Sequence, residues 1–207
     1  MPFITVEGLD GSGKTTLCSK IAAWLQFHSI PVVSTREPDG AIRDLIKSRS
    51  WDPMTTLLLF EADRSYHVKT VVRPALDTRK TVLCDRYCHS TLAYNTGSSH
   101  YSDSLVHLLN EETTDNLCPH LVIWVKVRPE TALTRCQTRD SGDAKDTADL
   151  DFLQKVHDKY EKMIDNTWAV LDGEQTPEQV FAELLASDKW RELFPVRRVP
   201  IDCFHGQ

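Results

Sequence analysis

Residues 6–16, VEGLDGSGKTT, decide the fold class of this chain. They fit the pattern G-x-x-x-x-G-K-[ST] through Gly8, Gly13, Lys14 and Thr15. The stretch follows an apolar run, FITVE (3–7), and opens a helix-forming segment that extends to about residue 28. In such a loop the glycines let backbone N–H groups point at phosphate oxygens, and the following helix adds its positive N-terminal end. The stretch therefore predicts a nucleotide-phosphate loop that joins a strand to a helix.

Beyond this loop, strand-like and helical segments alternate. Apolar runs typical of strands occur at 3–7, 31–35, 81–85, 120–127 and 168–172, with helical patterns between them, including 53–76 and a last one that begins at 176–178. This order predicts an α/β fold, a P-loop NTPase-type three-layer α/β/α sandwich with a five-stranded parallel sheet. The motifs GLDGSGKT (8–15), TREP (35–38) and DRY (85–87) follow strands, so they should converge at one edge of the sheet.

Composition limits the class of protein. The chain has 207 residues, 41% of them hydrophobic, which favours a single domain over 1–207. A net charge of −6 argues against a general nucleic-acid binder. No apolar stretch approaches the ~18 residues of a membrane span, so we expect a soluble, cytoplasmic protein. The six cysteines form no CxxC pair, which favours free thiols over a disulfide scaffold or a zinc site.

Several further motifs resemble one family. In order along the chain they are FITVEGLDGSGKTT (3–16), TREPDG (35–40), LLLFEADRSYHV (57–68), DRYCHSTLAYN (85–95), PHLVIWVKVRPETALTRCQTR (119–139) and DFLQKVHDKY (151–160). Their order and spacing over residues 3–185 resemble thymidylate kinases of the bacterial type, and the abbreviated segments leave a phage origin open. The resemblance implies a homodimeric kinase that transfers the γ-phosphoryl group of ATP to dTMP with Mg²⁺, giving dTDP and ADP in dTTP biosynthesis.

For the donor side, phosphate-loop chemistry and the resemblance agree. Lys14 should bridge the β- and γ-phosphates, and Thr15 should coordinate Mg²⁺, with Asp85 ordering the water shell of the metal. The residues expected around ATP are Gly8, Asp10, Gly11, Ser12, Gly13, Lys14, Thr15, Thr16, Arg135 and Arg139.

For the acceptor phosphate and sugar, the resemblance implies a second set. Arg36 and Arg86 hold the phosphate, because a guanidinium matches two phosphate oxygens at once. Asp10 faces the sugar 3′-hydroxyl and orients one of these arginines. Tyr94 lies under the sugar, where its ring excludes a 2′-hydroxyl.

For the pyrimidine base, the resemblance implies a third set. Phe60 and Arg64 are four residues apart and share a helical face, so that Phe60 stacks on the base while Arg64 contacts O4 of thymine. Ser90 and Thr91 lie near the base edge, with Asn95 beside them.

A lid should complete the site. Gly11 stands where one class of these kinases carries an arginine, so the missing charge should come from a mobile lid at about 136–149. Arg135 and Arg139 are four residues apart, and Arg139 is the residue expected to reach the transferring group when the lid closes. Closure would also exclude water.

Some departures from the family pattern leave alternatives open. Asp39 and Gly40 replace the usual glycine pair, Asn95 replaces a frequent Gln or Ser, and Gln137 and four aspartates dilute the lid charge. A kinase of a 5-modified dUMP, such as the 5-hydroxymethyl form in a phage, would have the same set of motifs. A deoxynucleoside kinase and a non-catalytic nucleotide-binding module are weaker alternatives. The segment 187–207 could be a docking tail, a dimer contact or a disordered end.

Overall fold

The computed structural model describes residues 1–96, 101–138 and 149–195. Within them a parallel five-stranded sheet has the order β2-β3-β1-β4-β5. The strands are β1 (Phe3–Glu7), β2 (Val32–Arg36), β3 (Thr81–Asp85), β4 (Leu121–Lys126) and β5 (Trp168–Asp172). The predicted α/β class is therefore confirmed, and each expected strand is present with ends shifted by at most one residue.

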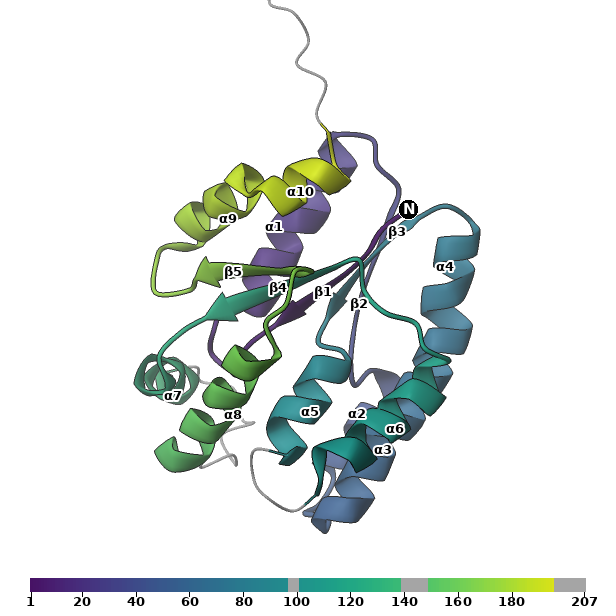
Figure 1. Ribbon diagram of the computed structural model, residues 1–207, viewed down its shortest axis with the longest axis vertical. Helices are drawn as coiled ribbons and strands as arrows, with labels where there is room; N and C mark the ends of the chain where they lie inside the picture. The colour runs from purple at the N-terminus through teal and green to yellow at the C-terminus, as the bar shows by residue number, and fades with distance from the viewer. Residues whose placement is uncertain (97–100, 139–148, 196–207) are drawn as a thin grey trace, which may run out of the picture.

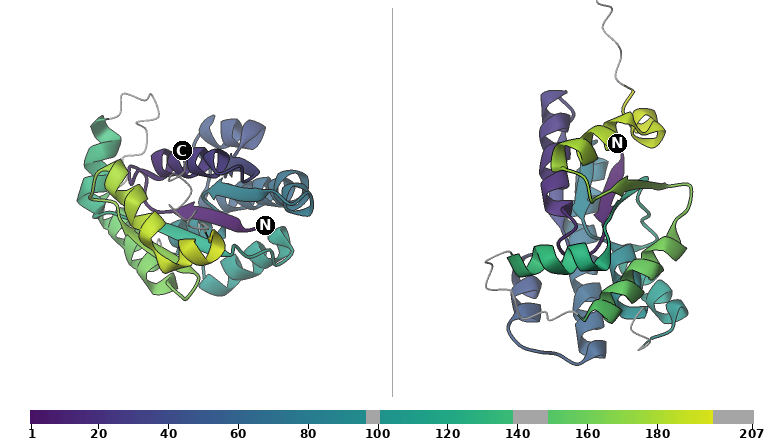
Figure 2. Two further views of the ribbon diagram at one scale, coloured as in Figure 1. Left: turned by 90° about the horizontal axis from the view of Figure 1, so that it is seen from above. Right: turned by 90° about the vertical axis from the view of Figure 1, so that its left-hand side faces the viewer.

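Helices cover both faces of the sheet, as Figures 1 and 2 show. On one face lie α1 (Lys14–Phe27), α9 (Pro177–Ala186) and α10 (Asp188–Leu193). On the other lie α5 (Cys88–Thr96), α8 (Leu150–Met163), the π-helical segment η1 (Val68–Val72) and α4 (Arg73–Asp77). At the carboxyl end of the sheet are α2 (Gly40–Lys47), α3 (Pro53–His67), α6 (Asp103–Thr114) and α7 (Pro129–Thr138).

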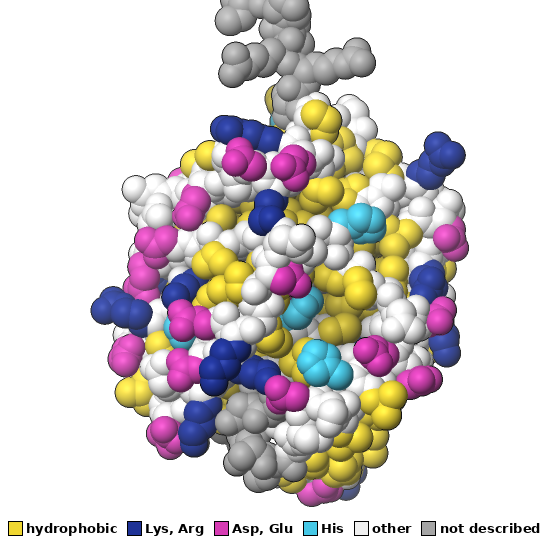
Figure 3. Space-filling model, viewed as in Figure 1, with side chains coloured by type: hydrophobic (Ala, Val, Ile, Leu, Met, Phe, Trp, Pro, Cys, Tyr) yellow, Lys and Arg dark blue, Asp and Glu magenta, His cyan; other side chains and the backbone are white. Residues whose placement is uncertain are grey.

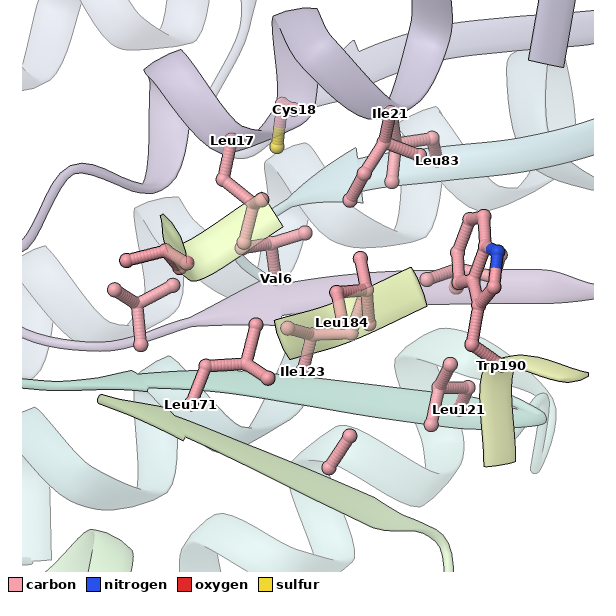
Figure 4. Close-up of a cluster of buried hydrophobic side chains, with 14 of the residues drawn as sticks. Val6, Leu17, Cys18, Ile21, Leu83, Leu121, Ile123, Leu171, Leu184 and Trp190 are labelled. Carbon is pink, nitrogen blue, oxygen red and sulfur yellow. The ribbon is translucent and has the colours of Figure 1, made fainter. Parts of the chain in front are cut away.

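The core has two sides because the central strand is buried on both faces. Ile4 and Val6 of β1 pack with Leu17 and Ile21 of α1, in the cluster drawn in Figure 4. Phe3 belongs to a cluster with η1 and α4 on the other face. Successive side chains of a strand alternate between faces, so Glu7, the last residue of β1, lies on the same face as Phe3.

The predicted helix starts follow from their capping residues. The Asp52 carboxylate accepts from the Thr55 N–H at 3.0 Å, and Pro53 occupies the first turn of α3. Thr176 and Gln179 form a reciprocal capping box at the start of α9. The long segment predicted at 53–76 runs as α3, η1 and α4 without a break to Asp77.

The beginning of the unassigned segment 187–207 belongs to the folded core. Ser187 caps α10, and Trp190 on this helix is 1% exposed. Its ring lies 5.4 Å from that of Trp24 on α1 and 4.6 Å from that of Phe194. The rest of the segment, 196–207, lies outside the described residues.

The surface carries mixed charge. On the face drawn in Figure 3, lysines and arginines are interspersed with acidic side chains. Within the described residues, no helix is both long enough and apolar enough to cross a membrane.

Candidate active site

A polar cleft lies at the carboxyl edge of the sheet. It is lined by Asp10, Gly11, Gly13, Lys14, Thr15, Arg36, Glu37, Arg43, Asp85 and Arg86. These residues come from the loop after β1, the end of β2, α2, the start of α1 and the end of β3. The register brings the strand ends together, because Asp85 pairs with both Val6 and Arg36. Four cationic side chains against three carboxylates make a cleft suited to phosphates.

The loop from residue 8 to 15 holds its lysine against its own backbone. Lys14 Nζ donates to the carbonyl oxygens of Gly8 at 3.0 Å and Leu9 at 2.7 Å. An ammonium has three donors, so one remains for a phosphate oxygen. Burial and, less strongly, the nearby Arg86 charge lower the pKa of Lys14 to about 8, while Asp10 and Asp85 oppose this shift.

A hydroxyl and a carboxylate meet beside this lysine. Thr15 Oγ1 donates to Asp85 Oδ2 at 2.8 Å, and Thr15 is exposed to the cleft. Oxygen donors with room for water and phosphate oxygens are what Mg²⁺ prefers. These two residues therefore fit the predicted metal.

Asp10 points at an arginine. Its Oδ1 accepts from Arg86 Nη2 at 2.6 Å, and the Arg86 charge holds the pKa of the Asp10 carboxyl well below its usual range. The Tyr94 ring lies under the same guanidinium, with 5.1 Å from Arg86 Cζ to the ring centroid. The Tyr94 hydroxyl accepts from the Asp10 N–H at 3.3 Å. Asp10 thus orients the Arg86 guanidinium within the cleft, as expected of this carboxylate from the sequence.

Gly11 lies directly beneath α7. A Cβ built on Gly11 would be 2.5 Å from the Ala132 carbonyl oxygen and 3.1 Å from Cys136 Sγ, and the backbone has φ +81°. An arginine therefore has no room here. Arg135, also on α7, donates from Nη1 to the Gly173 carbonyl oxygen at 2.9 Å, in the loop after β5. Arg139 and most of the expected lid lie outside the described residues.

The two residues expected at the base differ in burial. Phe60 is partly buried, whereas Arg64 is 2% exposed. Arg64 Nε donates to Glu37 Oε2 at 2.8 Å, and its Nη1 donates to Glu61 Oε1 at 3.0 Å and Asn110 Oδ1 at 2.6 Å. Within the described residues no bond is formed by Nη2, which leaves this nitrogen for a ligand.

A buried histidine fixes the end of β2. His67 Nδ1 donates to Glu37 Oε1 at 2.9 Å, since a carboxylate only accepts, and Nε2 lies 2.7 Å from Thr35 Oγ1. Thr35 and Glu37 flank Arg36, which is exposed in the cleft. One imidazole therefore holds both neighbours of that arginine.

Two residues of α5 that were expected at the base edge, Ser90 and Thr91, are buried. Ser90 is 9% and Thr91 5% exposed. Ser90 Oγ accepts from Arg86 Nη1 at 2.9 Å, so its hydroxyl is engaged with an arginine that lines the cleft. Asn95 Nδ2 donates to the Thr91 carbonyl oxygen at 2.9 Å. Their contacts with a base edge stay a prediction.

Sequence reasoning missed Glu37 and Arg43, which line the cleft. It also missed Glu7, which bonds to Ser90, and Glu61 and Asn110, which bond to Arg64. The sequence could have indicated Glu7, because it is a carboxylate at the end of a run of strand residues that are expected to be buried. Glu37 stood inside a quoted motif. Arg43 and Asn110 had no such signal, because only the folded chain brings α2 to the cleft and α6 to Arg64.

Comparison with known proteins agrees with this geometry. The family model described as thymidylate kinase matches residues 6–184. A thymidylate kinase of Coprothermobacter proteolyticus is 36% identical over 192 residues, which cover 90% of this chain and 98% of that protein. Those of Carboxydothermus hydrogenoformans and Bdellovibrio bacteriovorus are each 36% identical, covering 88% and 90% of this chain and 94% and 95% of theirs.

Proposed function

Because the chain belongs to the thymidylate kinase family, we propose that its cleft transfers the γ-phosphoryl group of ATP to dTMP, giving dTDP and ADP for dTTP synthesis. The observation that carries this assignment is the placement of Arg86. The guanidinium is held by Asp10 and faces the same cleft as Arg36 and the phosphate-loop Lys14. One fixed arginine and a second, exposed arginine opposite a phosphate loop suit an acceptor that already carries a phosphate.

On the donor side, the loop from residue 8 to 15 binds the triphosphate. Lys14 uses its remaining donor on the β- and γ-phosphates. Thr15 and, through water, Asp85 would hold Mg²⁺, which supplies neutralising charge between the phosphates when bound. Arg135 lies beside the loop after β5, and Arg139 completes the charge from the lid.

On the acceptor side, Arg36 and Arg86 hold the dTMP phosphate in line with the donor. Tyr94 supports the sugar and Asp10 accepts from its 3′-hydroxyl. Phe60 stacks on thymine while the free Nη2 of Arg64 donates to O4. Thr91 and Asn95 close the base edge, whereas the Ser90 hydroxyl on the same helix is engaged with Arg86. Catalysis then rests on alignment and charge stabilisation rather than on a covalent intermediate.

The arginine assignment is tested by steady-state kinetics of Arg36→Gln and Arg86→Gln. Loss of a charged hydrogen bond should raise the KM for dTMP about tenfold to a hundredfold, while the KM for ATP changes far less. Arg191→Gln, an exposed arginine on α10, is the matched control and should behave as wild type. Unchanged dTMP kinetics in Arg86→Gln would refute the assignment.

We also propose a cytoplasmic homodimer. Met54, Leu58 and Tyr66 form an exposed apolar stripe on α3, with exposures of 38%, 49% and 70%. The stripe lies on the opposite side of the helix from Phe60 and Arg64, since a step of two residues turns a helix by about 200°. Sedimentation velocity should give a dimer for the wild type and a monomer for Leu58→Glu. A monomeric wild type would contradict the proposal.

A further inference from the structure

A buried carboxylate lies directly behind the acceptor arginine. Glu7 is the last residue of β1 and is 0% exposed. Its side chain lies on the face of the sheet that α5 and α8 cover. It therefore does not reach the cleft and cannot touch a nucleotide bound there.

Three donors hold this carboxylate. Glu7 Oε1 accepts from the Tyr87 N–H at 2.8 Å, and Oε2 accepts from Ser90 Oγ at 2.5 Å and from the Tyr160 hydroxyl at 3.1 Å. All three donors are uncharged. Within the described residues, no lysine or arginine forms an ion pair with Glu7, so stabilising a buried charge pair is not its role.

The Ser90 hydroxyl connects Glu7 to Arg86. Ser90 has one proton, which it gives to Glu7, and this leaves its oxygen lone pairs to accept from Arg86 Nη1 at 2.9 Å. The same Nη1 lies 3.3 Å from the Gly8 carbonyl oxygen, while Nη2 binds Asp10. Both outer nitrogens of the Arg86 guanidinium are thus held, Nη1 by Ser90 and the Gly8 carbonyl and Nη2 by Asp10.

The backbone of the DRY turn is held by the same strand. Arg86 has φ +76°, a left-handed conformation that non-glycine residues rarely adopt. Its own N–H donates to the Val6 carbonyl oxygen at 3.0 Å, and the next N–H, that of Tyr87, donates to Glu7 Oε1. Such a conformation persists where the surroundings enforce it. Consecutive residues of β1 therefore fix the turn on both sides of Arg86.

We propose that Glu7 is a positioning residue for phosphoryl transfer, which fixes the Arg86 guanidinium toward the acceptor phosphate through Ser90 and through the backbone of Tyr87. The inference rests on the proposed role of Arg86 and extends it to a residue with no ligand contact. An aligned arginine loses less freedom when the phosphate binds, which lowers the KM for the acceptor and aligns the phosphates in the transition state.

The electrostatic environment agrees with this geometry. Burial raises the pKa of Glu7 to about 7, against the lowering effects of the Ser90 bond, the Arg86 charge and the Tyr160 bond. The other titratable groups near Glu7 are Lys14 on α1, Cys84 on β3, Cys88 on α5 and Tyr160 on α8. A carboxylate buried in this way costs stability, and carboxylates with such raised pKa values cluster at functional sites.

The test compares Glu7→Gln, Ser90→Ala and the double variant in steady-state kinetics. Each single variant should lower kcat/KM for dTMP at least tenfold while the KM for ATP stays within about twofold of wild type. Because both act through one chain of bonds to Arg86, the double variant should be no worse than the more damaged single variant. Thr5→Val is the matched control, since Thr5 is equally buried on the same face of β1 and its hydroxyl has no partner among the described residues.

Three results would overturn the proposal: wild-type kcat/KM for dTMP in Glu7→Gln, an equal loss toward dTMP and ATP, or losses that multiply in the double variant. Thermal melting checks that each variant folds, and if Glu7→Gln does not fold, Ser90→Ala decides alone. Arg86→Gln separates this inference from its premise. If Arg86→Gln leaves dTMP kinetics unchanged, the proposed site fails, whereas damage in Arg86→Gln with none in Glu7→Gln refutes only the role of Glu7.

Discussion

At Gly11 the lack of a side chain lets α7 lie directly on the phosphate loop. A Cβ would meet the Ala132 carbonyl oxygen at 2.5 Å, and backbone atoms cannot move aside as a side-chain end can. In the proposed site, the charge that an arginine would bring to this position is expected from another element, the lid. The identity of one residue in the loop thus decides how closely α7 can approach it.

Gly11→Ala should lower both stability and activity. We expect a loss of more than about 2 kcal/mol in the free energy of unfolding, from the left-handed backbone and the clash together, and a kcat at least tenfold lower. Gly40→Ala is the matched control, because Gly40 also has positive φ, +55°, but a Cβ there meets nothing within 4 Å. Equal melting temperatures for the two variants would contradict the packing of α7 on Gly11.

The raised pKa of Glu7 predicts how the stability of the protein changes with pH. Its folded pKa of about 7 lies above its ordinary value of 4.5, so between these pH values the folded state binds more protons than the unfolded state. The free energy of unfolding should fall as pH rises through this window. At about 1.4 kcal/mol per pKa unit, Glu7→Gln should gain on the order of 3 kcal/mol relative to wild type between pH 4.5 and 7. Urea denaturation of both proteins over this pH range measures the difference in unfolding free energy. A difference that does not change with pH would contradict the prediction.

At the scale of elements, most of the fold could be predicted. The strands were apparent as apolar runs, because two-sided burial in a parallel sheet requires them, and α3 and α9 were marked by Asp52-Pro53 and Thr176-Pro177. The helix α10 could not be predicted. Its six residues are too few for a clear periodicity, and its place depends on Trp24 in α1, more than 160 residues earlier in the chain.

Trp190→Ala should show that α10 is part of the core. Removing a fully buried indole should cost about 3–5 kcal/mol of unfolding free energy. Phe27→Ala removes an aromatic ring of α1 that is 84% exposed, and it should change stability by less than about 0.5 kcal/mol. Chemical denaturation compares the two. A Trp190→Ala variant as stable as Phe27→Ala would contradict the packing of α10.

At the scale of the whole molecule, the cleft exists because parallel strands end at one edge. The motifs of residues 8–15, 35–38 and 85–87 converge there, as the sequence pattern predicts. Asp10 was expected to orient an arginine, but other residues that hold the arginines or their supports could not be predicted, because they are distant in the chain. Asn110 lies 46 residues from Arg64, and Tyr160 lies 153 residues from Glu7. A single sequence contains no signal for such pairs.

The most direct test of the central claim is ADP release from ATP and Mg²⁺ with four acceptors compared side by side, namely dTMP, 5-hydroxymethyl-dUMP, dUMP and thymidine. If Arg36 and Arg86 hold the acceptor phosphate and Arg64 contacts the base, as proposed, the enzyme should give the highest kcat/KM with dTMP and no turnover of thymidine. Preference for the hydroxymethyl nucleotide would contradict the choice of dTMP. Turnover of thymidine alone, or of no acceptor, would contradict the account of the site.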